Sequence, residues 1–340
     1  MKKTVTILTL VLIVAAFACQ KEIVNQVFTF KSPPYFPKPT YHFETNNITD
    51  AGFKLGKKLF YDSLLSIDNS TCCGSCHIST SAFTHHGHDL SHGLNGSLTK
   101  RNSPPIMNLA WSSSFMWDGG IADLDLQPIA PITSHIEMGE TMENVVSKIN
   151  KNPAYQPLVN KAFGTNSITG EIMLKALSQF MLMCTSTEAK YDSVKRGQEK
   201  YTQAEQEGYN IFLAKCNACH NEPLFTDNSF RNTGLKTSIL NDSGRYLITL
   251  DKRDLFSFKV PSLRNISYTP PYMHDGRFFS LADAIEHYNS QVVNMSTLDP
   301  LLKKEGSPGI RLTSDEKTKL IAFLKTLDDR KFITNRKLAE

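Results

Sequence analysis

The chain has 340 residues, of which 40% are hydrophobic and 21% are charged, and its formal net charge is +4. This length is enough for about two domains, and the composition is that of an ordinary globular protein. The charge is too small, and the Lys and Arg residues are too scattered, for a nucleic-acid-binding protein. We therefore expect no nucleic-acid partner.

The N-terminus predicts export from the cytoplasm. Met1-Lys2-Lys3 is a basic start, an apolar run follows from Val5 to Phe17, and Cys19 comes directly after a small residue. This order is typical of a secretory signal, and the apolar run is too short for a membrane span. We expect a signal peptide over residues 1–18 and a periplasmic protein. The end of the signal also resembles a bacterial lipoprotein signal, so we expect a lipid on Cys19 as the only membrane attachment, with plain cleavage as the alternative.

The first elements of the mature chain are a linker, a helix and a long loop. Residues 19–45 are expected to be a linker, because the proline-rich stretch from Ser32 to Pro39 cannot be helical. Thr49 and Asp50 are suitable caps for a helix in which apolar residues recur at helical spacing (Phe53, Leu55, Leu59 and Phe60). Residues 78–108 are rich in Gly, Ser, Asn, His and Pro and are expected to form a long loop.

The rest of the chain predicts further helices and almost no strands. Thr169 is expected to cap one of these helices, and Thr313 and Glu316 form a capping box for another. The predicted helical ranges are 141–162 with a break at Pro153, 170–184, 203–215, 281–288 and 314–327. Since few segments alternate in the manner of a strand, the predicted fold class is mostly α.

Two short motifs predict covalent haem. Cys73-Gly74-Ser75-Cys76-His77 and Cys216-Asn217-Ala218-Cys219-His220 both read Cys-x-x-Cys-His, the attachment signature of c-type haem. Two thiols three residues apart project from one helical face and can bond the two vinyl groups of one porphyrin, and the following His can ligate the iron. We therefore expect two covalent haem c groups, with His77 and His220 as iron ligands.

Other uses of these cysteines fit less well. A redox-active disulfide does not require the trailing His, and a zinc site needs its ligands to converge on one point. Cys72 is left over, because it lies one residue too far from Cys76 for the motif. Cys184 lies on an apolar helical face and is expected to be buried.

The haem motifs also indicate how the chain is divided. A helix precedes each motif, which is a weak internal repeat. We expect an N-terminal haem domain over residues 46–200 and a C-terminal haem domain over residues 201–330. The predicted architecture is therefore two c-type cytochrome-like haem domains with long connecting loops.

Several groups near the first motif could serve chemistry at its iron. The loop after His77 contains four further histidines, and a tryptophan and a glutamate follow (His85, His86, His88, His92, Trp117 and Glu137). A carboxylate above an open iron could move the proton that cleavage of a peroxide bond requires. From the residues alone, the favoured interpretation is that each histidine is a solvated loop residue, Trp117 a core residue and Glu137 a helix-entry residue.

The order of motifs resembles that of the bacterial di-haem cytochrome c peroxidase family, which includes the MauG-like proteins. The resemblance runs from about residue 50 to residue 328. It rests, besides the haem motifs, on Leu55-Gly56-Lys57-Lys58-Leu59-Phe60-Tyr61-Asp62, Leu65-Ser66, Ala82-Phe83-Thr84, Arg101-Asn102-Ser103-Pro104, Trp117-Asp118-Gly119, Glu137-Met138, Val260-Pro261-Ser262-Leu263-Arg264-Asn265 and Thr269-Pro270-Pro271-Tyr272-Met273-His274-Asp275-Gly276.

The resemblance implies roles for individual residues. The first haem would react with peroxide, Glu137 would be its acid–base residue, and Gln127 would be the companion of Glu137 in the pocket. Trp117 would lie between the two haems. A calcium ion would be bound by Asn102 and by the main-chain carbonyls of Thr269 and Pro271, and hard oxygen ligands of this kind suit calcium.

Two positions depart from the pattern of the peroxidases proper. His92 precedes by two residues the position at which those enzymes have a displaceable iron ligand. At the position where they have the distal Met of the second haem, this chain has Tyr288, as MauG-like proteins do. A phenolate would favour ferric iron, whereas a thioether would raise the reduction potential. Tyr288 is the predicted ligand and Met295 is the alternative.

The resemblance implies a dihaem peroxidase that reduces hydrogen peroxide to water. Its first haem would become ferryl, and a small cytochrome or similar donor protein would supply electrons through the second haem. One alternative is a MauG-like oxidase of a partner protein, and another is a dihaem electron carrier without peroxide chemistry. Members of this family are often dimers, so a homodimer is a further expectation.

Overall fold

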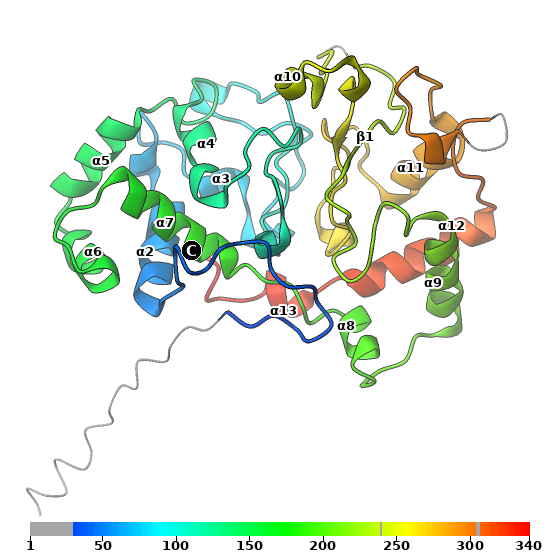
Figure 1. Ribbon diagram of the computed structural model, residues 1–340, viewed down its shortest axis with the longest axis horizontal. Coiled ribbons are helices and arrows are strands. Elements are labelled where there is room, and N and C mark those ends of the chain that lie inside the picture. The colour runs from blue at the N-terminus through cyan, green and yellow to red at the C-terminus, as the bar shows by residue number, and fades with distance from the viewer. Residues whose placement is uncertain (1–29, 239, 304–306) are drawn as a thin grey trace, which may run out of the picture.

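The computed structural model describes residues 30–238, 240–303 and 307–340 (Figure 1). The predicted signal peptide and the predicted lipid site at Cys19 lie outside these residues. The described chain is mostly helical, and its only sheet pairs two short antiparallel strands, β1 (Phe230–Arg231) and β2 (Phe258–Lys259). The predicted mostly-α class is confirmed.

The helices form two lobes that lie side by side in Figure 1. The first lobe contains α2 (Asp50–Phe60), α3 (Cys73–Cys76), α4 (Ile129–Thr133), α5 (Met142–Lys151), α6 (Gln156–Phe163) and α7 (Gly170–Leu182). The second lobe contains α8 (Lys190–Lys195), α9 (Gln203–Lys215), α10 (Tyr246–Thr249), α11 (Leu281–Glu286) and α12 (Ser314–Leu324). The last helix, α13 (Arg330–Ile333), returns to the first lobe, where Phe332 packs against Phe83.

The same helix pairing occurs in both lobes. A Cβ atom added at Gly56 of α2 would lie 1.9 Å from the carbonyl oxygen of Ala176 in α7. A Cβ atom added at Gly208 of α9 would lie at the same distance from the carbonyl oxygen of Lys319 in α12. Each glycine therefore allows two backbones to approach closely just before a haem motif. The internal repeat that the sequence indicates is thus present in the packing.

Local signals explain where these helices begin. Thr49, Thr169 and Thr313 each accept a hydrogen bond from a main-chain amide in the first turn, and the predicted capping box of Thr313 and Glu316 is present. The range predicted around Pro153 is two helices, α5 and α6. The range predicted to end at Tyr288 differs, because α11 ends at Glu286 and widens into a π-helical turn over His287–Gln291.

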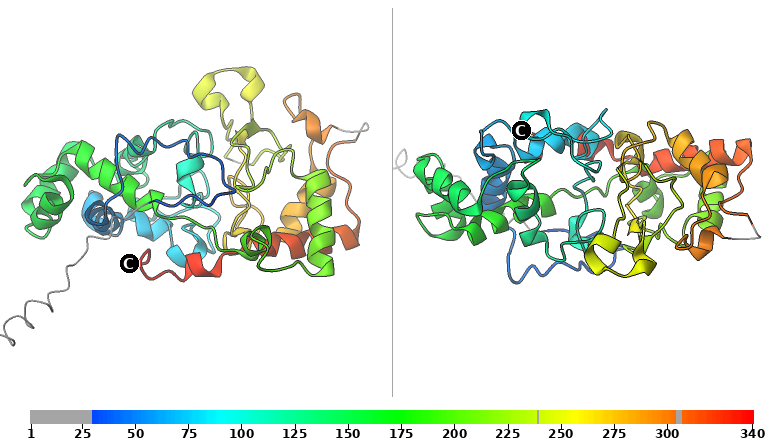
Figure 2. Two further views of the ribbon diagram at one scale, coloured as in Figure 1. Left: turned by 60° about the horizontal axis from the view of Figure 1, so that its bottom comes forward. Right: turned by 90° about the horizontal axis from the view of Figure 1, so that it is seen from above.

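The described part of the predicted linker, residues 30–45, is not a free tether. Figure 2 shows this N-terminal segment running across the body of the protein. The side chain of Phe36 is buried, the indole of Trp111 donates to the carbonyl oxygen of Pro37 at 2.8 Å, and the Tyr35 hydroxyl donates to Asp192 at 2.8 Å. Aromatic residues among the prolines pack against the body, so the absence of a helix does not make this segment a spacer.

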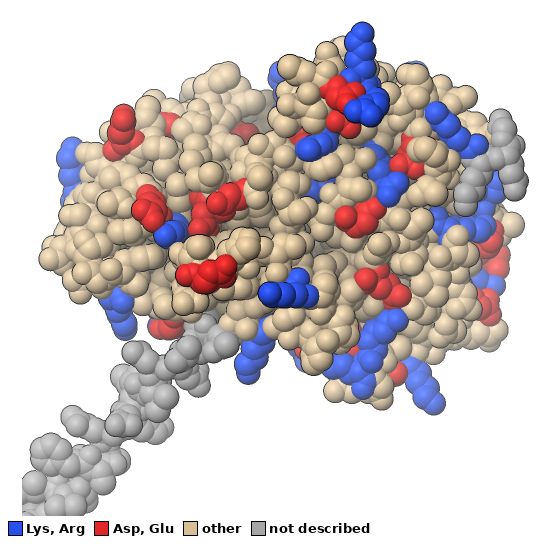
Figure 3. All heavy atoms as spheres, viewed as in Figure 1, with Lys and Arg blue, Asp and Glu red and all other residues tan. Residues whose placement is uncertain are grey.

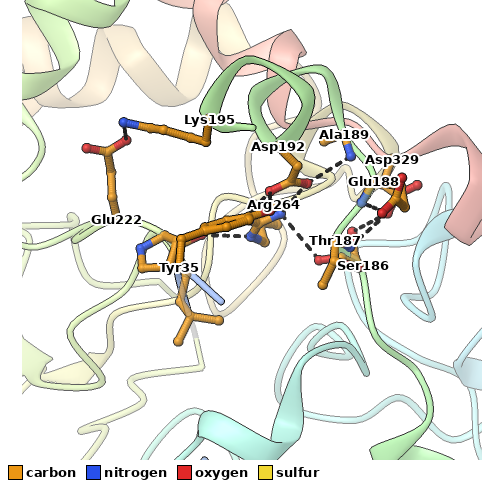
Figure 4. Close-up of polar contacts among 12 residues, drawn as sticks. Tyr35, Ser186, Thr187, Glu188, Ala189, Asp192, Lys195, Glu222, Arg264 and Asp329 are labelled. Carbon is orange, nitrogen blue, oxygen red and sulfur yellow. Dashed lines mark hydrogen bonds and ion pairs between the residues drawn. The ribbon is translucent and has the colours of Figure 1, made fainter. Parts of the chain in front are cut away.

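A fully buried ion pair helps to join this segment to the second lobe (Figure 4). The guanidinium of Arg264 donates to both carboxylate oxygens of Asp192, at 2.8 and 3.0 Å, and neither side chain is exposed to solvent. The Tyr35 hydroxyl and the main-chain amide of Ala189 donate to the same carboxylate. The carboxylate is thus neutralised and hydrogen-bonded, as a buried charge must be.

Charged side chains of both signs are interspersed on the face of the molecule shown in Figure 3. This agrees with the small net charge. Among the described residues, no helix combines the length and the apolar character that a membrane span requires.

Candidate active site

A cavity of about 600 Å³ opens beside the first haem motif and is lined by residues from both lobes. Seven of the predicted site residues line it: Cys73, Cys76, His77, Asn102, Trp117, Gln127 and Glu137. His92 lines it as well. Residues that lie far apart in the sequence therefore meet around one cavity, which could not be predicted from their spacing.

The first motif has the donor set that a c-type haem requires. Cys73 and Cys76 are the first and last residues of the short helix α3, and both are free thiols. His77 follows immediately and lines the same cavity. Two thiols and one imidazole beside a large cavity fit two thioether bonds and one axial iron ligand. Cys184, in contrast, is fully buried in the apolar core, as predicted.

The histidines of the two motifs are held in the same way. The Nδ1 atom of His77 is 2.7 Å from the carbonyl oxygen of Phe83, and that of His220 is 3.1 Å from the carbonyl oxygen of Phe225. A hydrogen bond at Nδ1 leaves Nε2 available for a metal. Burial lowers the pKa of both imidazoles, which favours the neutral form that binds iron.

Both residues whose carbonyl oxygens accept these hydrogen bonds occupy an uncommon backbone conformation. Phe83 has a φ of 62° and Phe225 a φ of 58°, in the left-handed region that bulky residues rarely adopt. Strained positions of this kind occur where the surrounding structure has a functional reason to hold them. Here each one aims a main-chain oxygen at a histidine of a haem motif.

The second motif lies at the C-terminal end of α9. The Tyr288 side chain lies close to this motif. Burial and, next in size, the thiols of Cys219 and Cys216 raise the pKa of the Tyr288 hydroxyl. Met295 packs in the same small apolar cluster as Tyr288. Both candidates for the sixth ligand are therefore on the side of the second motif, and the choice between them stays a prediction.

The carboxyl group of Glu137 lies at the first motif. Burial raises the pKa of this carboxyl. Burial and, next in size, the nearby Glu137 carboxylate also raise the pKa of the Cys76 thiol to about 11. Gln127 lines the same cavity, and its amide donates to the sulfur of Met116 at 3.7 Å. A buried carboxyl group with a raised pKa beside a haem attachment site can hold and release a proton.

Trp117 lies at the contact between the lobes. Its indole Nε1 donates to the carbonyl oxygen of Asn102 at 2.8 Å, and its own carbonyl oxygen accepts from the main-chain amide of Lys259 at 2.8 Å. The amide of Asn102 donates to the carbonyl oxygen of His274 at 2.7 Å. Lys259 precedes His274 by the same number of residues as Asn102 precedes Trp117, so the two cross-lobe hydrogen bonds join equivalent positions.

Asn102 is one of the three predicted calcium ligands. The side-chain amide of Asn102 donates to the carbonyl oxygens of His88 and Asp89, at 3.2 and 3.1 Å. Thr269 is buried. No cluster of three or more His, Cys, Asp or Glu side chains suited to a metal ion occurs in the described parts of the chain. The site predicted at Asn102, Thr269 and Pro271 would use amide and main-chain oxygens, and it stays a prediction.

Three of the loop histidines are neighbours in space. The rings of His85 and His88 are stacked with centroids 4.6 Å apart, and Nε2 of His92 is 3.2 Å from Nδ1 of His88. The Nδ1 atom of His85 is buried without a hydrogen-bond partner. Burial, followed by the like charges of His88 and His92, lowers the pKa of His85 to about 4. Spacing in the sequence did not reveal this cluster.

Lys259 was not among the predicted site residues, although this residue of the second lobe lines the cavity at the first motif. One signal was available. Pro104 lies two residues after Asn102, and Pro261 lies two residues after the equivalent residue, Lys259. The carbonyl of Pro104 lies at His77, and the carbonyl of Pro261 lies at His220. These two equivalent segments each contact the histidine of a haem motif, so their repetition in the sequence indicates residues near the haem sites.

Comparisons with known proteins agree with this site. The family model for di-haem cytochrome c peroxidase matches residues 50–200. The methylamine utilization protein MauG of Methylophilus methylotrophus is 33% identical over 306 residues, covering 88% of this chain and 88% of that protein. The cytochrome c551 peroxidase of Nitrosomonas europaea is 31% identical, covering 81% of this chain and 79% of that protein.

Solved structures show the same fold. A MauG-like protein associated with microbial copper homeostasis is similar with a TM-score of 0.83 and 30% identity, covering 92% of this chain and 99% of that one. The diheme peroxidase BthA from Burkholderia thailandensis is similar with a TM-score of 0.73 and 19% identity, covering 90% and 88%. The second likeness concerns the fold alone.

Proposed function

Because the chain belongs to the di-haem cytochrome c peroxidase family, we propose that it is an oxidoreductase that reduces hydrogen peroxide to water. The observation that carries this proposal is the cavity beside Cys73, Cys76 and His77, with the partly buried Glu137 carboxyl on its wall. A haem c bound at this motif would supply the iron that reacts with peroxide. A second haem c at Cys216, Cys219 and His220 would store or pass on an electron.

Glu137 is the proton-transfer residue in this proposal. As a carboxylate it would accept a proton from one oxygen of the bound peroxide, and it would then donate that proton to the other oxygen, which would leave as water. A carboxyl group whose pKa is raised by burial suits both steps, because it gains and loses a proton more readily near neutral pH. Gln127, on the same cavity wall, would orient the bound peroxide through its amide.

Trp117 is the residue through which the lobes exchange electrons in this proposal. Its indole is held by Asn102 and its main chain by Lys259, so residues of both lobes fix its position. Asn102, with the carbonyls of Thr269 and Pro271, would bind a calcium ion at the same contact. A hard cation there would stiffen the contact and hold the two haems at a constant separation.

Oxidation of a partner protein is the second candidate function. It is favoured by Tyr288, which lies at the second motif, and by the similarity to two proteins named MauG at 33% identity. In that case the oxidising equivalents made from peroxide would be used on side chains of the partner. The peroxidase would instead take electrons from a small cytochrome or similar donor.

We also propose a domain organisation, a location and an oligomeric state for this protein. The two lobes would be c-type cytochrome-like haem domains over residues 46–200 and 201–330. The protein would act in the periplasm, anchored by a lipid on Cys19, and could form a homodimer.

A steady-state assay tests the proposed function. The full-length holoprotein is mixed with hydrogen peroxide and a reduced small c-type cytochrome, and oxidation of the cytochrome is followed by absorbance. Peroxide-dependent oxidation, with two cytochromes oxidised for each peroxide consumed, supports the peroxidase. Consumption of peroxide without oxidation of any cytochrome favours the partner oxidase. Absence of peroxide consumption would overturn both functions and leave the electron carrier.

A further inference from the structure

Lys259 is an unneutralised cation beside the first motif. It lies in β2 of the second lobe and lines the cavity that contains Cys73, Cys76 and His77 on its wall. Its ammonium donates to the carbonyl oxygen of Ser114 at 2.7 Å, and burial lowers its pKa to about 8. Within residues 30–238, 240–303 and 307–340 it forms no ion pair with a carboxylate.

The carboxylates of the cavity wall have other partners or form no ion pair with Lys259. Asp118 and Asp242 both pair with Arg101, at 2.5 and 2.6 Å. Glu137, whose pKa burial raises, forms no ion pair with Lys259. Lys100, the remaining cation of the wall, is exposed to solvent. Removing an ammonium from water without a counter-charge costs free energy. An anionic ligand in the cavity would therefore be stabilised next to Lys259.

A haem c supplies such an anion, because it carries two propionate carboxylates on the edge opposite its thioether bonds. An ammonium has three donors, and Ser114 uses one of those of Lys259. The main-chain amide of Lys259 is fixed by the carbonyl oxygen of Trp117, so the stem of the side chain starts from a defined point at the lobe contact. The ammonium also lies 5.9 Å from the centroid of the Phe115 ring, and its side chain lines the cavity.

We propose that Lys259 of the second lobe binds a propionate of the haem attached at Cys73 and Cys76 in the first lobe. This inference rests on the proposed function only in so far as that function places a haem c in the cavity. Lys259 is then a positioning residue. It turns the propionate edge of the first haem towards the lobe contact and Trp117, and it ties the cofactor of one lobe to the backbone of the other.

The charge of Lys259 also favours the reduced first haem, because ferrous haem carries one positive charge fewer than ferric haem. Removing the charge should therefore lower the reduction potential of the first haem. We expect a change of roughly tenfold in its ferric–ferrous equilibrium constant, which is 59 mV for a one-electron couple. The potential of the second haem should stay unchanged.

The test is a redox titration of the full-length holoprotein, followed by visible absorbance and by the ferric EPR signals that distinguish the two haems. The variants are Lys259→Met, which keeps the length and removes the charge, and Lys259→Arg, which keeps the charge. Lys100→Met is the matched control, because it removes an exposed cation of the same cavity wall. We expect a lower first-haem potential in Lys259→Met, and wild-type values for both haems in Lys259→Arg and Lys100→Met.

Three results would overturn the proposal: an unchanged first-haem potential in Lys259→Met, a shift confined to the second haem, or equal shifts in Lys259→Met and Lys259→Arg. Should Lys259→Met fail to retain haem, the wild type decides. A lysine paired with a propionate keeps its charge well above pH 8, so the first-haem potential should show no step between pH 7 and pH 9. A step near pH 8 would contradict the pairing. Neither titration uses peroxide, so failure of the peroxidase function is recorded separately.

Discussion

The main-chain amide of Lys259 donates a hydrogen bond to the carbonyl oxygen of Trp117 across the contact between the lobes, at 2.8 Å. The equivalent bond runs from Asn102 to His274 in the opposite direction, at 2.7 Å. Two backbone hydrogen bonds between equivalent positions form a contact with approximate two-fold symmetry inside one chain. This contact holds Trp117 where the first lobe meets the second, and in the proposed function electrons pass between the haems through this residue.

Replacing Trp117 by Phe should slow electron transfer between the haems without loss of either haem. The phenyl ring lacks the indole Nε1 that donates to Asn102, and it is much harder to oxidise. We expect a decrease of about tenfold or more in the rate, equal to roughly 1.4 kcal/mol in the barrier. Rapid mixing of the half-reduced protein with peroxide measures this rate. Trp111→Phe, the same change at the only other tryptophan, is the control, and equal effects of both changes would contradict the assignment.

Replacing Glu137 by Gln should abolish peroxide turnover while the visible spectrum shows both haems bound. The amide keeps the size of the side chain but cannot accept a proton, and loss of a general acid–base residue costs about 10²–10⁴-fold in rate. The measurement is kcat/KM for peroxide. Glu143→Gln, at an exposed position in the first turn of α5, is the matched control and should keep full activity. Normal activity of the Glu137 variant would refute its role.

The pH dependence of peroxide reactivity should have an acidic limb that belongs to Glu137. Burial raises the pKa of this carboxyl above the ordinary value of about 4.3, and only the ionised form can accept the peroxide proton. Reactivity should therefore fall as the pH decreases through the raised pKa, and kcat/KM measured over pH 4–8 reports that pKa. A limb centred at or below pH 4 would show that a group other than buried Glu137 controls the step.

Replacing Tyr288 by Met should raise the reduction potential of the second haem. A phenolate ligand stabilises ferric iron, whereas a thioether stabilises ferrous iron. Spectroelectrochemical titration measures the potential, and a long-wavelength absorption band of ferric iron bound to methionine should appear. Met295→Leu should leave the wild-type spectrum and potential unchanged. If Met295→Leu altered both and Tyr288→Phe altered neither, Met295 would be the ligand.

Replacing Asp192 by Asn should destabilise the protein by about 3–5 kcal/mol, because it leaves the guanidinium of Arg264 buried without a counter-charge. Urea unfolding of the holoprotein, followed by far-UV circular dichroism, measures the change in free energy of unfolding. Lys54→Met breaks an exposed ion pair with Asp50 and should cost less than about 1 kcal/mol. Similar effects of the two changes would show that the buried network does not hold the N-terminal segment to the second lobe.

The parts of the fold that were predicted from the sequence depend on local signals. Thr49, Thr169 and Thr313 cap helices because a hydroxyl, a first turn and an apolar face are read from neighbouring residues. The two haem motifs are local as well. The end of α11 was not predicted, since nothing in the residues around Tyr288 announces that the helix widens into a π-helical turn.

The parts that could not be predicted depend on contacts between distant segments. The packing of residues 30–45 is set by partners such as Trp111 and Asp192, which lie far along the chain. Lys259 enters the first-lobe cavity only because the lobes meet as they do. Glu137, Gln127 and Trp117 were predicted as site residues from the resemblance to a family. The structure shows that all three line one cavity.

The most direct test of the proposed function is stopped-flow absorbance of the full-length holoprotein mixed with hydrogen peroxide, in the as-isolated and half-reduced forms. We expect a rapid kinetic phase in which the first haem is oxidised and its Soret band shifts. This phase should be lost in Glu137→Gln. A phase seen only after half-reduction would show that a ligand such as His92 must first leave the iron. Absence of any reaction in both forms would contradict the peroxidase and leave a dihaem electron carrier.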